Sequence, residues 1–296
     1  MARIKTVSVL INVYKRVNLL QKQIEAIESQ SYRVKEIFIW NNYGGKKLPS
    51  KITSKYKCVI ANYNFGVWAR FAFALNIDSD FICLFDDDTV PGRRWIENCV
   101  ITHKKFPGLL GTRGLRFLSN KSYYPFKSYG WDNPNNDTVE VNIVGHSWFF
   151  EKKLLNYFWS EQPPESFPKN SGEDIHFSYM LQKYHNIKTY VPPHPTHDPS
   201  LWGSSEKIGK KFGLDKNAIS QQGDALSKFD IYFKYYIKNG FVTKINDSLI
   251  KENVFVFDFG LRRFKKFKSI LKKSKFIFLL SKKIIDFLRK FNIHIT

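Results

Sequence analysis

Residues 81–88 read FICLFDDD, an unbroken apolar run that ends in three consecutive aspartates. The run Phe81–Phe85 has the length of a strand, and its lack of polar alternation predicts that both faces are buried. Three neighbouring carboxylates repel one another, and a divalent cation removes that cost. The alternative is a polar turn, because Asp88-Thr89-x-Pro91-Gly92 is also turn chemistry. The stretch therefore predicts a buried strand that leads into either a metal site or a turn.

Apolar runs of strand length also precede this stretch, at Val7–Val13 and at residues 36–40 and 57–61. Between them, residues 18–29 and 66–75 have apolar positions at helical spacing. Strands that alternate with helices predict an α/β fold with a Rossmann-like, mostly parallel sheet that helices cover on both faces.

Polar side chains follow three of these predicted strands. Tyr14 and Arg16 follow the first, Asn41 and Asn42 the second, and Asp86-Asp87-Asp88 the fourth. Ligands of such sheets bind beyond the carboxyl ends of the strands. We therefore expect these three groups to gather at one edge of the sheet.

The second half of the chain has a different character. Residues 139–144 are predicted to form a strand, 145–147 a turn and 148–158 an aromatic-rich segment. Residues 173–184 have the pattern of a helix, with Asp174 in the first turn, where the helix dipole favours a carboxylate.

These motifs together resemble the GT-A glycosyltransferases, which use nucleotide-sugar donors. Asp86-Asp87-Asp88 is similar to the D-x-D element of that fold, which binds a divalent metal and the donor diphosphate. Residues 7–16 (VSVLINVYKR) resemble its opening strand. Residues 64–70 (NFGVWAR) resemble the N-x-G-x-x-x-A-R element of the synthase-type family 2, which includes cellulose and hyaluronan synthases.

Other segments resemble the exostosin-like branch of the fold. They are residues 39–42 (IWNN) with Gly44, residues 86–89 (DDDT), residues 144–150 (VGHSWFF) and residues 172–175 (GEDI). The resemblance covers about residues 5–205. One departure is that Trp202 is followed by Gly203-Ser204-Ser205, where that branch has an arginine that meets the donor phosphate. The stereochemistry of transfer therefore stays open.

The resemblance implies a set of residues that bind the nucleotide-sugar. Tyr14 would pack on the base and Arg16 would face a phosphate. Asn41 or Asn42 would read the base edge, because an amide offers both a donor and an acceptor. The synthase-type family has aspartates there, and a plain Asn-Gly-type turn is the alternative. The set is completed by Asn64 and Arg70, near the ribose or diphosphate, and by Asp86 and Asp87.

The resemblance also implies metal and catalytic residues. Asp88 is the expected ligand of Mn²⁺ or Mg²⁺, and His197 is a second candidate ligand, unless it is only a surface-loop histidine. Asp174, with Glu173 beside it, is the expected acceptor-side carboxylate. It would deprotonate the acceptor hydroxyl in an inverting enzyme, or steady positive charge on the sugar in a retaining one. The alternative is a pair of charges that only stabilises a helix N-terminus.

The chain carries 47 Lys and Arg against 26 Asp and Glu over 296 residues, a net charge of +21. Residues 261–296 hold 12 of these cations and one acid, so they contribute 12 − 1 = +11. Their apolar residues recur every three or four positions, which predicts a basic amphipathic helix that suits an anionic membrane surface. A helix packed on the domain or on a partner protein is the alternative. We see no nucleic-acid-binding signature and expect no nucleic acid partner.

We expect a GT-A catalytic domain over residues 1–215, with a nucleotide-sugar half (1–105) and an acceptor half (106–215). Residues 216–296 would form a helical extension. The cysteines are three, an odd number without a C-x-x-C pair, which favours a reducing compartment. No apolar stretch approaches the roughly 20 residues that span a bilayer. The expected location is cytoplasmic and peripheral, at the inner face of a membrane.

The predicted function is metal-dependent transfer of a sugar, with UDP the expected nucleotide, to a saccharide or lipid-linked glycan in surface polysaccharide, lipopolysaccharide or glycan synthesis. Two alternatives come from other classes. A nucleotidyltransferase of similar fold would need a glycine-rich loop after the first strand, and residues 14–18 contain no glycine. A basic nucleic-acid-binding protein would depend on residues 261–296.

Overall fold

The computed structural model describes residues 4–43, 46–213, 218–219, 224–244 and 293–294. Within these ranges one mixed sheet has the strand order β3–β2–β1–β4–β8–β5–β6–β10. The parallel half holds β1 (Val7–Val13), β2 (Val34–Asn41), β3 (Lys57–Ile60) and β4 (Phe81–Phe85). The antiparallel half holds β5 (Gly108–Phe117), β6 (Phe126–Gly130), β8 (Ile143–Glu151) and β10 (Ile293–His294). Two further strands, β7 (Val139–Val141) and β9 (Lys188–Val191), pair with each other, and β9 also pairs with β5.

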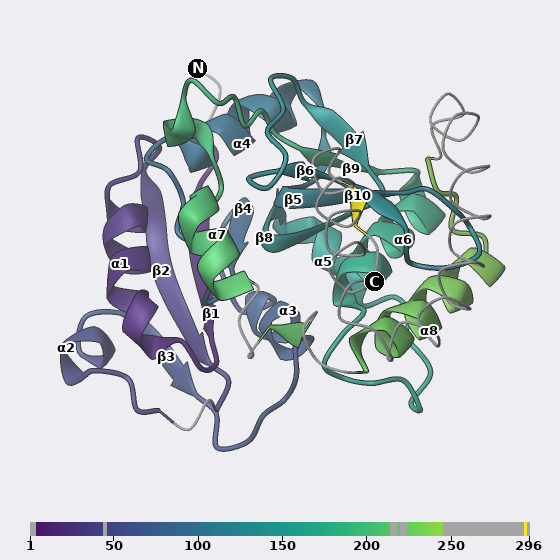
Figure 1. Cartoon of the computed structure of the whole chain (residues 1–296). Helices are drawn as coiled ribbons and strands as arrows, with labels where there is room; N and C mark the ends of the chain where they lie inside the picture. The colour runs from purple at the N-terminus through teal and green to yellow at the C-terminus, as the bar shows by residue number, and fades with distance from the viewer. Residues whose placement is uncertain (1–3, 44–45, 214–217, 220–223, 245–292, 295–296) are drawn as a thin grey trace, which may run out of the picture.

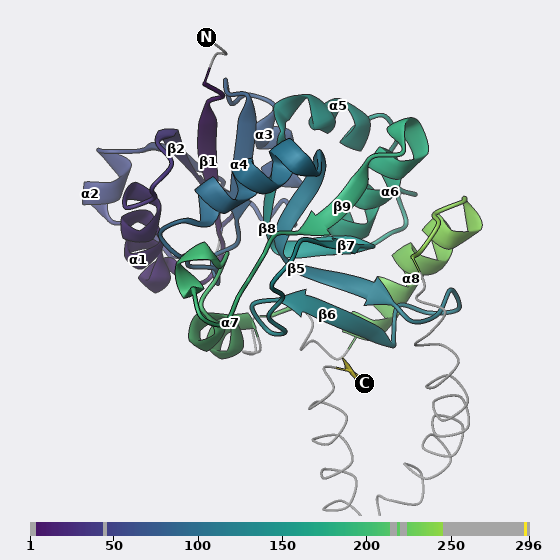
Figure 2. The same ribbon diagram turned by 90° about the horizontal axis from the view of Figure 1, so that it is seen from above.

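Helices cover both faces of the sheet, which confirms the predicted α/β fold (Figure 1). One face packs against α1 (Val17–Glu28), α2 (Ser50–Thr53) and α4 (Trp95–Lys105). The opposite face packs against α3 (Ala69–Ala74), α5 (Leu155–Phe158), α6 (Glu173–His185) and α8 (Ala225–Lys238). Figure 2 shows the same layers from above, with α7 (Glu206–Gly213) beside the sheet. Two short 3₁₀ helices occupy Lys152–Leu154 and Pro199–Leu201.

Strand β4 shows why its sequence has no polar alternation. Successive side chains of a strand point to opposite faces. Phe81, Cys83 and Phe85 belong to the core under α1 and α4, whereas Ile82 and Leu84 belong to the core under α3 and α6. Both faces of β4 are therefore buried, and its carboxyl end emerges between the two cores.

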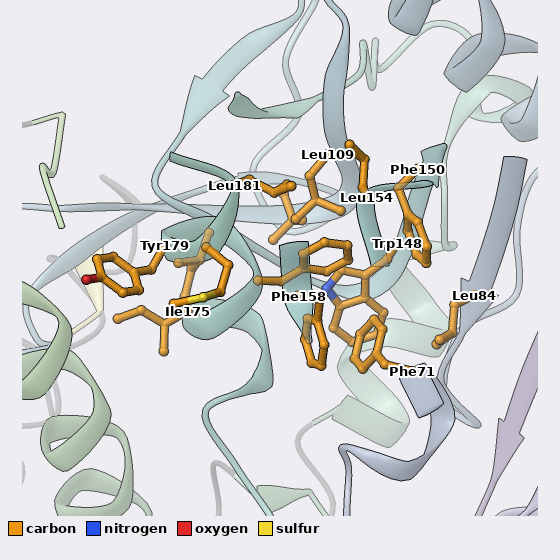
Figure 3. Packing of buried hydrophobic residues seen from close by; sticks show 14 of the residues in the cluster. Phe71, Leu84, Leu109, Trp148, Phe150, Leu154, Phe158, Ile175, Tyr179 and Leu181 are labelled. Carbon is orange, nitrogen blue, oxygen red and sulfur yellow. The ribbon is translucent and has the colours of Figure 1, made fainter. Parts of the chain in front are cut away.

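The core under α3 and α6 is built from stacked aromatic rings (Figure 3). The rings of Phe71 and Phe158 stack with centroids 4.7 Å apart, and Phe71 meets the edge of Trp148 at 5.6 Å. Phe177 of α6 packs against the same three-ring cluster. This packing fixes α3 and α6 on the sheet, and these two helices carry Arg70 and Glu173.

The predicted strand at 139–144 is found as two strands that break at Asn142, whereas the predicted turn at 145–147 is wrong. The chain forms the short strand β7, and then β8 continues through residues 145–147. Gly111 of β5 pairs with Trp148 and Arg113 pairs with Gly145, so β8 has one extra residue in that interval. This is a β-bulge, and His146 adopts a φ of 64° within it. The bulge keeps the strand paired while it redirects the His146 side chain.

The C-terminal region is described only in part. Helix α8 lies within the predicted extension 216–296 and packs on α6. Of the predicted basic amphipathic helix at 261–296, only residues 293–294 are described, and they form β10 against β6. The remainder of that segment lies outside the described residues, and the domain boundary near residue 215 stays a prediction. No described helix has the length and apolar character required to cross a membrane.

Candidate active site

Asp87 fastens the loop after β1 to the end of β4. Its Oδ2 accepts hydrogen bonds from the backbone N–H groups of Tyr14, Lys15 and Arg16 at 3.0–3.1 Å. Its Oδ1 lies 2.6 Å from Nη1 of Arg16, whose Nη2 donates to the carbonyl of Phe212 at 2.7 Å. Both side chains are buried. The predicted nucleotide contacts of Asp87 and Arg16 stay predictions, because the bonds described here go to the protein itself.

Asp88 lies 3.9 Å from the same Nη1 of Arg16 and also meets a histidine that the predicted site set does not include. Its Oδ1 lies 3.5 Å from Nδ1 of His146 and accepts a hydrogen bond from Thr89. Burial opposes ionisation of Asp88, but the charges of His146 and Arg16 outweigh burial and hold its pKa below the ordinary value. Asp88 is therefore a buried carboxylate that favours its charged form.

Asp86 lies on the other side of the triplet and faces Arg70. Its Oδ1 contacts Nη1 of Arg70, and Nδ2 of Asn12 donates to it at 3.5 Å. Burial raises the pKa of Asp86 to about 7, although the positive charge of Arg70 opposes the rise. Because β4 ends at Phe85 and the chain turns at residues 87–88, Asp86 and Asp88 do not share a face as they would in an extended strand, and they have different partners.

Arg70 joins the end of β4 to the start of α6. Its Nη2 lies 2.5 Å from Oε1 of Glu173, while its Nη1 contacts Asp86. Arg70 is 2% exposed, and its guanidinium carbon lies 4.4 Å from the ring centroid of Trp148, within cation–π range. A planar guanidinium can hold two carboxylates at once, so two acidic segments 87 residues apart in the sequence meet at one cation.

Glu173 and Asp174 open helix α6, as predicted. Gly172 is the N-cap, with a φ of 86° that side-chain-bearing residues rarely adopt. Burial raises the pKa of Glu173 to about 7 against the opposing charge of Arg70. Burial also raises the pKa of Asp174 to about 6, against a hydrogen bond of 2.7 Å from the N–H of Ile175. Two carboxyl groups with pKa values near neutrality therefore lie side by side.

The two asparagines after β2 play different parts. Asn42 is buried and donates to Asn64 at 3.1 Å and to the carbonyl of Gly66 at 2.9 Å, and its Oδ1 accepts from Phe65. Asn64 in turn donates to the hydroxyl of Tyr14 at 3.2 Å. Asn41 is also buried, and its Oδ1 has no hydrogen-bond partner among the described residues. Asn42 therefore holds the loops together, whereas the Oδ1 of Asn41 is a buried acceptor without a described partner, and base reading by either residue stays a prediction.

Among the described residues, no group of three or more His, Cys, Asp or Glu side chains is arranged to hold a metal ion. His197 is exposed, and no described ion pair or hydrogen bond joins it to Asp88. Its neighbour Asp198 pairs instead with Arg94 at 3.3 Å. The metal role of His197 stays a prediction. The pair of Asp88 and His146 has the hard oxygen and imidazole nitrogen that suit Mn²⁺.

Sequence reasoning missed His146 as a site residue because its approach to Asp88 depends on the pairing of β4 with β8. Phe85 lies opposite Ser147, and the N–H of Asp86 donates to the carbonyl of His146 at 3.0 Å. The sequence did contain one signal for His146. This histidine lies inside the apolar segment 144–150, which resembles an acceptor-side motif.

Comparison with known proteins shows the family of the chain. Residues 8–183 match the family "Glycosyl transferase family 2". A search of curated protein sequences found no match. Among solved structures, S. aureus TarS 1-349 in complex with UDP-GlcNAc is 13% identical with a TM-score of 0.45, over 64% of this chain and 56% of that one. The mannosyltransferase PcManGT from Pyrobaculum calidifontis in complex with GDP-Man and Mn²⁺ is 14% identical with a TM-score of 0.41, over 67% and 59%.

The chain therefore spans little more than half of the length of these two structures. The resemblance to the exostosin-like branch stays a prediction. The family match, in contrast, covers more than half of the 296 residues. The protein belongs to glycosyl transferase family 2.

Proposed function

We propose that the protein transfers a sugar from a nucleoside-diphosphate donor to a saccharide hydroxyl. The observation that carries this proposal is the contact of Arg70 with both Asp86 and Glu173. The first carboxylate ends a central strand on the donor side, and the second opens the helix of the acceptor side. A donor and an acceptor that bind to these two segments would meet beside one guanidinium.

The donor would lie over the ends of β1, β2 and β4. Asn41 supports a role in reading the base, because its buried Oδ1 has no hydrogen-bond partner among the described residues. Tyr14 is held at its hydroxyl by Asn64, which would present the ring to the base. Arg70 and Asp86 would face the ribose or diphosphate. UDP is the nucleotide that we propose.

Asp88 and His146 would hold a divalent cation, Mn²⁺ or Mg²⁺. Their oxygen and nitrogen atoms fit such an ion, and Asp88 Oδ1 lies 3.5 Å from His146 Nδ1, which brings the two donors together. A bound cation would supply neutralisation of the negative charge that develops on the departing diphosphate. His197 remains the alternative ligand.

Asp174 is the proposed acceptor-side carboxylate, and Glu173 is proposed to orient Arg70. Glu173 Oε1 is engaged by the guanidinium at 2.5 Å, whereas the carboxylate of Asp174 accepts from the N–H of Ile175 in its own helix turn. A pKa of about 6 suits a base that removes a hydroxyl proton near neutral pH. In a retaining reaction the same carboxylate would steady positive charge on the sugar carbon.

The setting of the reaction is also part of the proposal. The acceptor would be a saccharide or lipid-linked glycan of surface polysaccharide, lipopolysaccharide or glycan synthesis. The +11 charge of residues 261–296 supports a peripheral position on the anionic inner face of a membrane. Family membership favours glycosyl transfer over the nucleotidyltransferase and nucleic-acid-binding alternatives.

A panel of nucleotide-sugars with Mn²⁺ in a thermal-shift assay tests the proposal. A true donor binds the folded state and raises the unfolding temperature. The selected donor should then be turned over by the wild type, and transfer to a saccharide should be lost in Asp174→Asn. Transfer at the wild-type rate by Asp174→Asn would remove the catalytic role of this residue, and no response to any nucleotide-sugar would contradict the proposed function.

A further inference from the structure

The ring of Tyr232 on α8 lies directly against the backbone that precedes the two α6 carboxylates. A Cβ atom added to Gly172 would lie 2.4 Å from Cγ and Cδ2 of Tyr232, closer than real Cβ contacts. Tyr232 is fully buried, and its hydroxyl donates to the carbonyl of Pro168 at 2.8 Å. One side chain of α8 therefore holds both ends of segment 168–172, which leads into Glu173.

The same segment is held on its other side by the loop before α3. The N–H of Val67 donates to the carbonyl of Lys169 at 3.2 Å, and Nε1 of Trp68 donates to that of Ser171 at 3.0 Å. A Cβ on Gly66 would lie 2.2 Å from the Lys169 carbonyl oxygen. Segment 168–172 is thus clamped between the donor-side loop and α8.

Helix α8 lies beyond the part of the chain that matches the family, residues 8–183. It makes a second polar contact with α6, where the hydroxyl of Tyr236 lies 2.6 Å from Nδ1 of His176. His176 lies two residues after Asp174, so that contact falls at the end of the first turn of α6, whereas Tyr232 lies against Gly172. The two tyrosines therefore hold α6 at different places, and only Tyr232 touches its entry.

We propose that Tyr232 is a positioning residue that sets the place of Glu173 and Asp174, and that α8 is thereby part of the catalytic unit. The inference rests on the proposed function. Without the ring, segment 168–172 keeps its contacts with Val67 and Trp68 on one side alone. The first turn of α6, which carries Glu173 and Asp174, would then shift relative to Arg70. A displacement of about 1 Å at a reacting group costs about 10²-fold in rate.

The test compares Tyr232→Leu with Tyr236→Leu, a matched change of a buried tyrosine on the same helix. Tyr232→Leu is expected to lower kcat for transfer by about 10- to 100-fold with the donor KM nearly unchanged. Tyr236→Leu is expected to lower the unfolding temperature to a similar extent and to leave kcat within about threefold of wild type. Hydrogen exchange at amides 169–175 should accelerate in the first variant and not in the second.

Equal effects of both variants on kcat and on exchange would overturn the inference, since α8 would then act on general stability alone. If Tyr232→Leu does not fold, Gly172→Ala provides the second test. Its methyl group must displace the ring of Tyr232 from the backbone of residue 172. Wild-type kcat in Gly172→Ala would also overturn it. A wild-type protein that turns over no nucleotide-sugar would defeat the proposed function instead, and the exchange comparison would still show whether Tyr232 holds the segment.

Discussion

Nη2 of Arg70 lies 2.5 Å from Oε1 of Glu173, while Nη1 of the same guanidinium contacts the carboxylate of Asp86. Three charged groups from α3, the end of β4 and the start of α6 thus share one network, in which Arg70 and Glu173 are buried and Asp86 is partly exposed. Such a network is costly to break, because removing the cation leaves buried carboxylates without compensation. It also makes the distance between the two acidic segments depend on a single side chain.

Arg70→Met should lower the free energy of unfolding by about 3–5 kcal/mol, since the buried carboxylate of Glu173 loses its cation and the partly exposed one of Asp86 loses it too. Urea unfolding at neutral pH measures this loss. Arg94→Met is the matched control, because Arg94 pairs with Glu97 while its own side chain is 43% exposed. That change should cost less than about 1 kcal/mol. Similar losses for the two variants would contradict the role of Arg70 as a buried bridge.

The parts of the site that could be predicted from the sequence are the local ones. A buried strand followed by Asp86–Asp88 is visible because apolar character and charge change abruptly at residue 86. The acidic first turn of α6 is visible because helix spacing follows it. Both describe what a segment does by itself.

The partners of these groups could not be predicted, because they depend on pairing between distant segments. His146 reaches Asp88 only through the bulge of β8, and Asp87 binds backbone N–H groups more than 70 residues away. Every residue except proline has a backbone N–H group, so the sequence does not show which of these groups a polar side chain binds. The nucleotide contact expected of Asp87 stays a prediction, and its bonds to the loop after β1 are what the structure adds.

Asp87→Asn should destabilise the folded protein. The substitution removes the charge that faces Arg16 at 2.6 Å and weakens the acceptor of three backbone N–H groups. Because a buried ion pair is broken from one side, the free energy of unfolding should fall by about 3–5 kcal/mol. Chemical unfolding, with and without Mn²⁺, measures it. A variant as stable as wild type would show that the loop after β1 does not depend on Asp87.

Glu173 should make the metal-free protein less stable as the pH rises. Its pKa is raised from 4.5 to about 7 by burial, so the folded protein binds this proton more tightly than the unfolded chain does. The contribution is fully present below about pH 4.5 and is lost as the pH rises through about 7. The stability of wild type relative to Glu173→Gln, whose amide does not titrate, should therefore decline over this window. Urea unfolding across the window measures the difference, and a difference that grows with pH would refute the raised pKa.

The metal ligands can be separated by three substitutions. Asp88→Asn and His146→Gln should each raise the Mn²⁺ concentration needed for half-maximal donor hydrolysis by about 10- to 100-fold, the scale known for groups that support a metal. His197→Gln should leave it unchanged if His146 is the ligand. The measurement is a Mn²⁺ titration of nucleotide-sugar hydrolysis. A shift in His197→Gln with none in His146→Gln would reverse the assignment and restore the ligand expected from the sequence.

The basic segment 261–296 should bind anionic membranes through its charge. Each Lys or Arg near an anionic surface contributes about 1 kcal/mol, so the triple change Lys265→Gln, Lys266→Gln and Lys268→Gln should weaken binding by about 10²-fold. Neutralisation is a sharper test than truncation, because Ile293 of β10 pairs with Lys127 of β6 and truncation would remove that strand.

Cosedimentation with phosphatidylglycerol vesicles measures this binding, and phosphatidylcholine vesicles give the uncharged reference. The matched control is neutralisation of three exposed lysines of the catalytic region, which are Lys104, Lys105 and Lys121. Binding should fall only in the first triple variant, and added salt should reproduce the fall in wild type because surface charges are screened. Transfer to a soluble saccharide should be the same in both variants, since neither set touches Arg70, Asp174 or Asp88. Equal loss of binding in the two variants would mean that overall charge, and not this segment, draws the protein to the membrane.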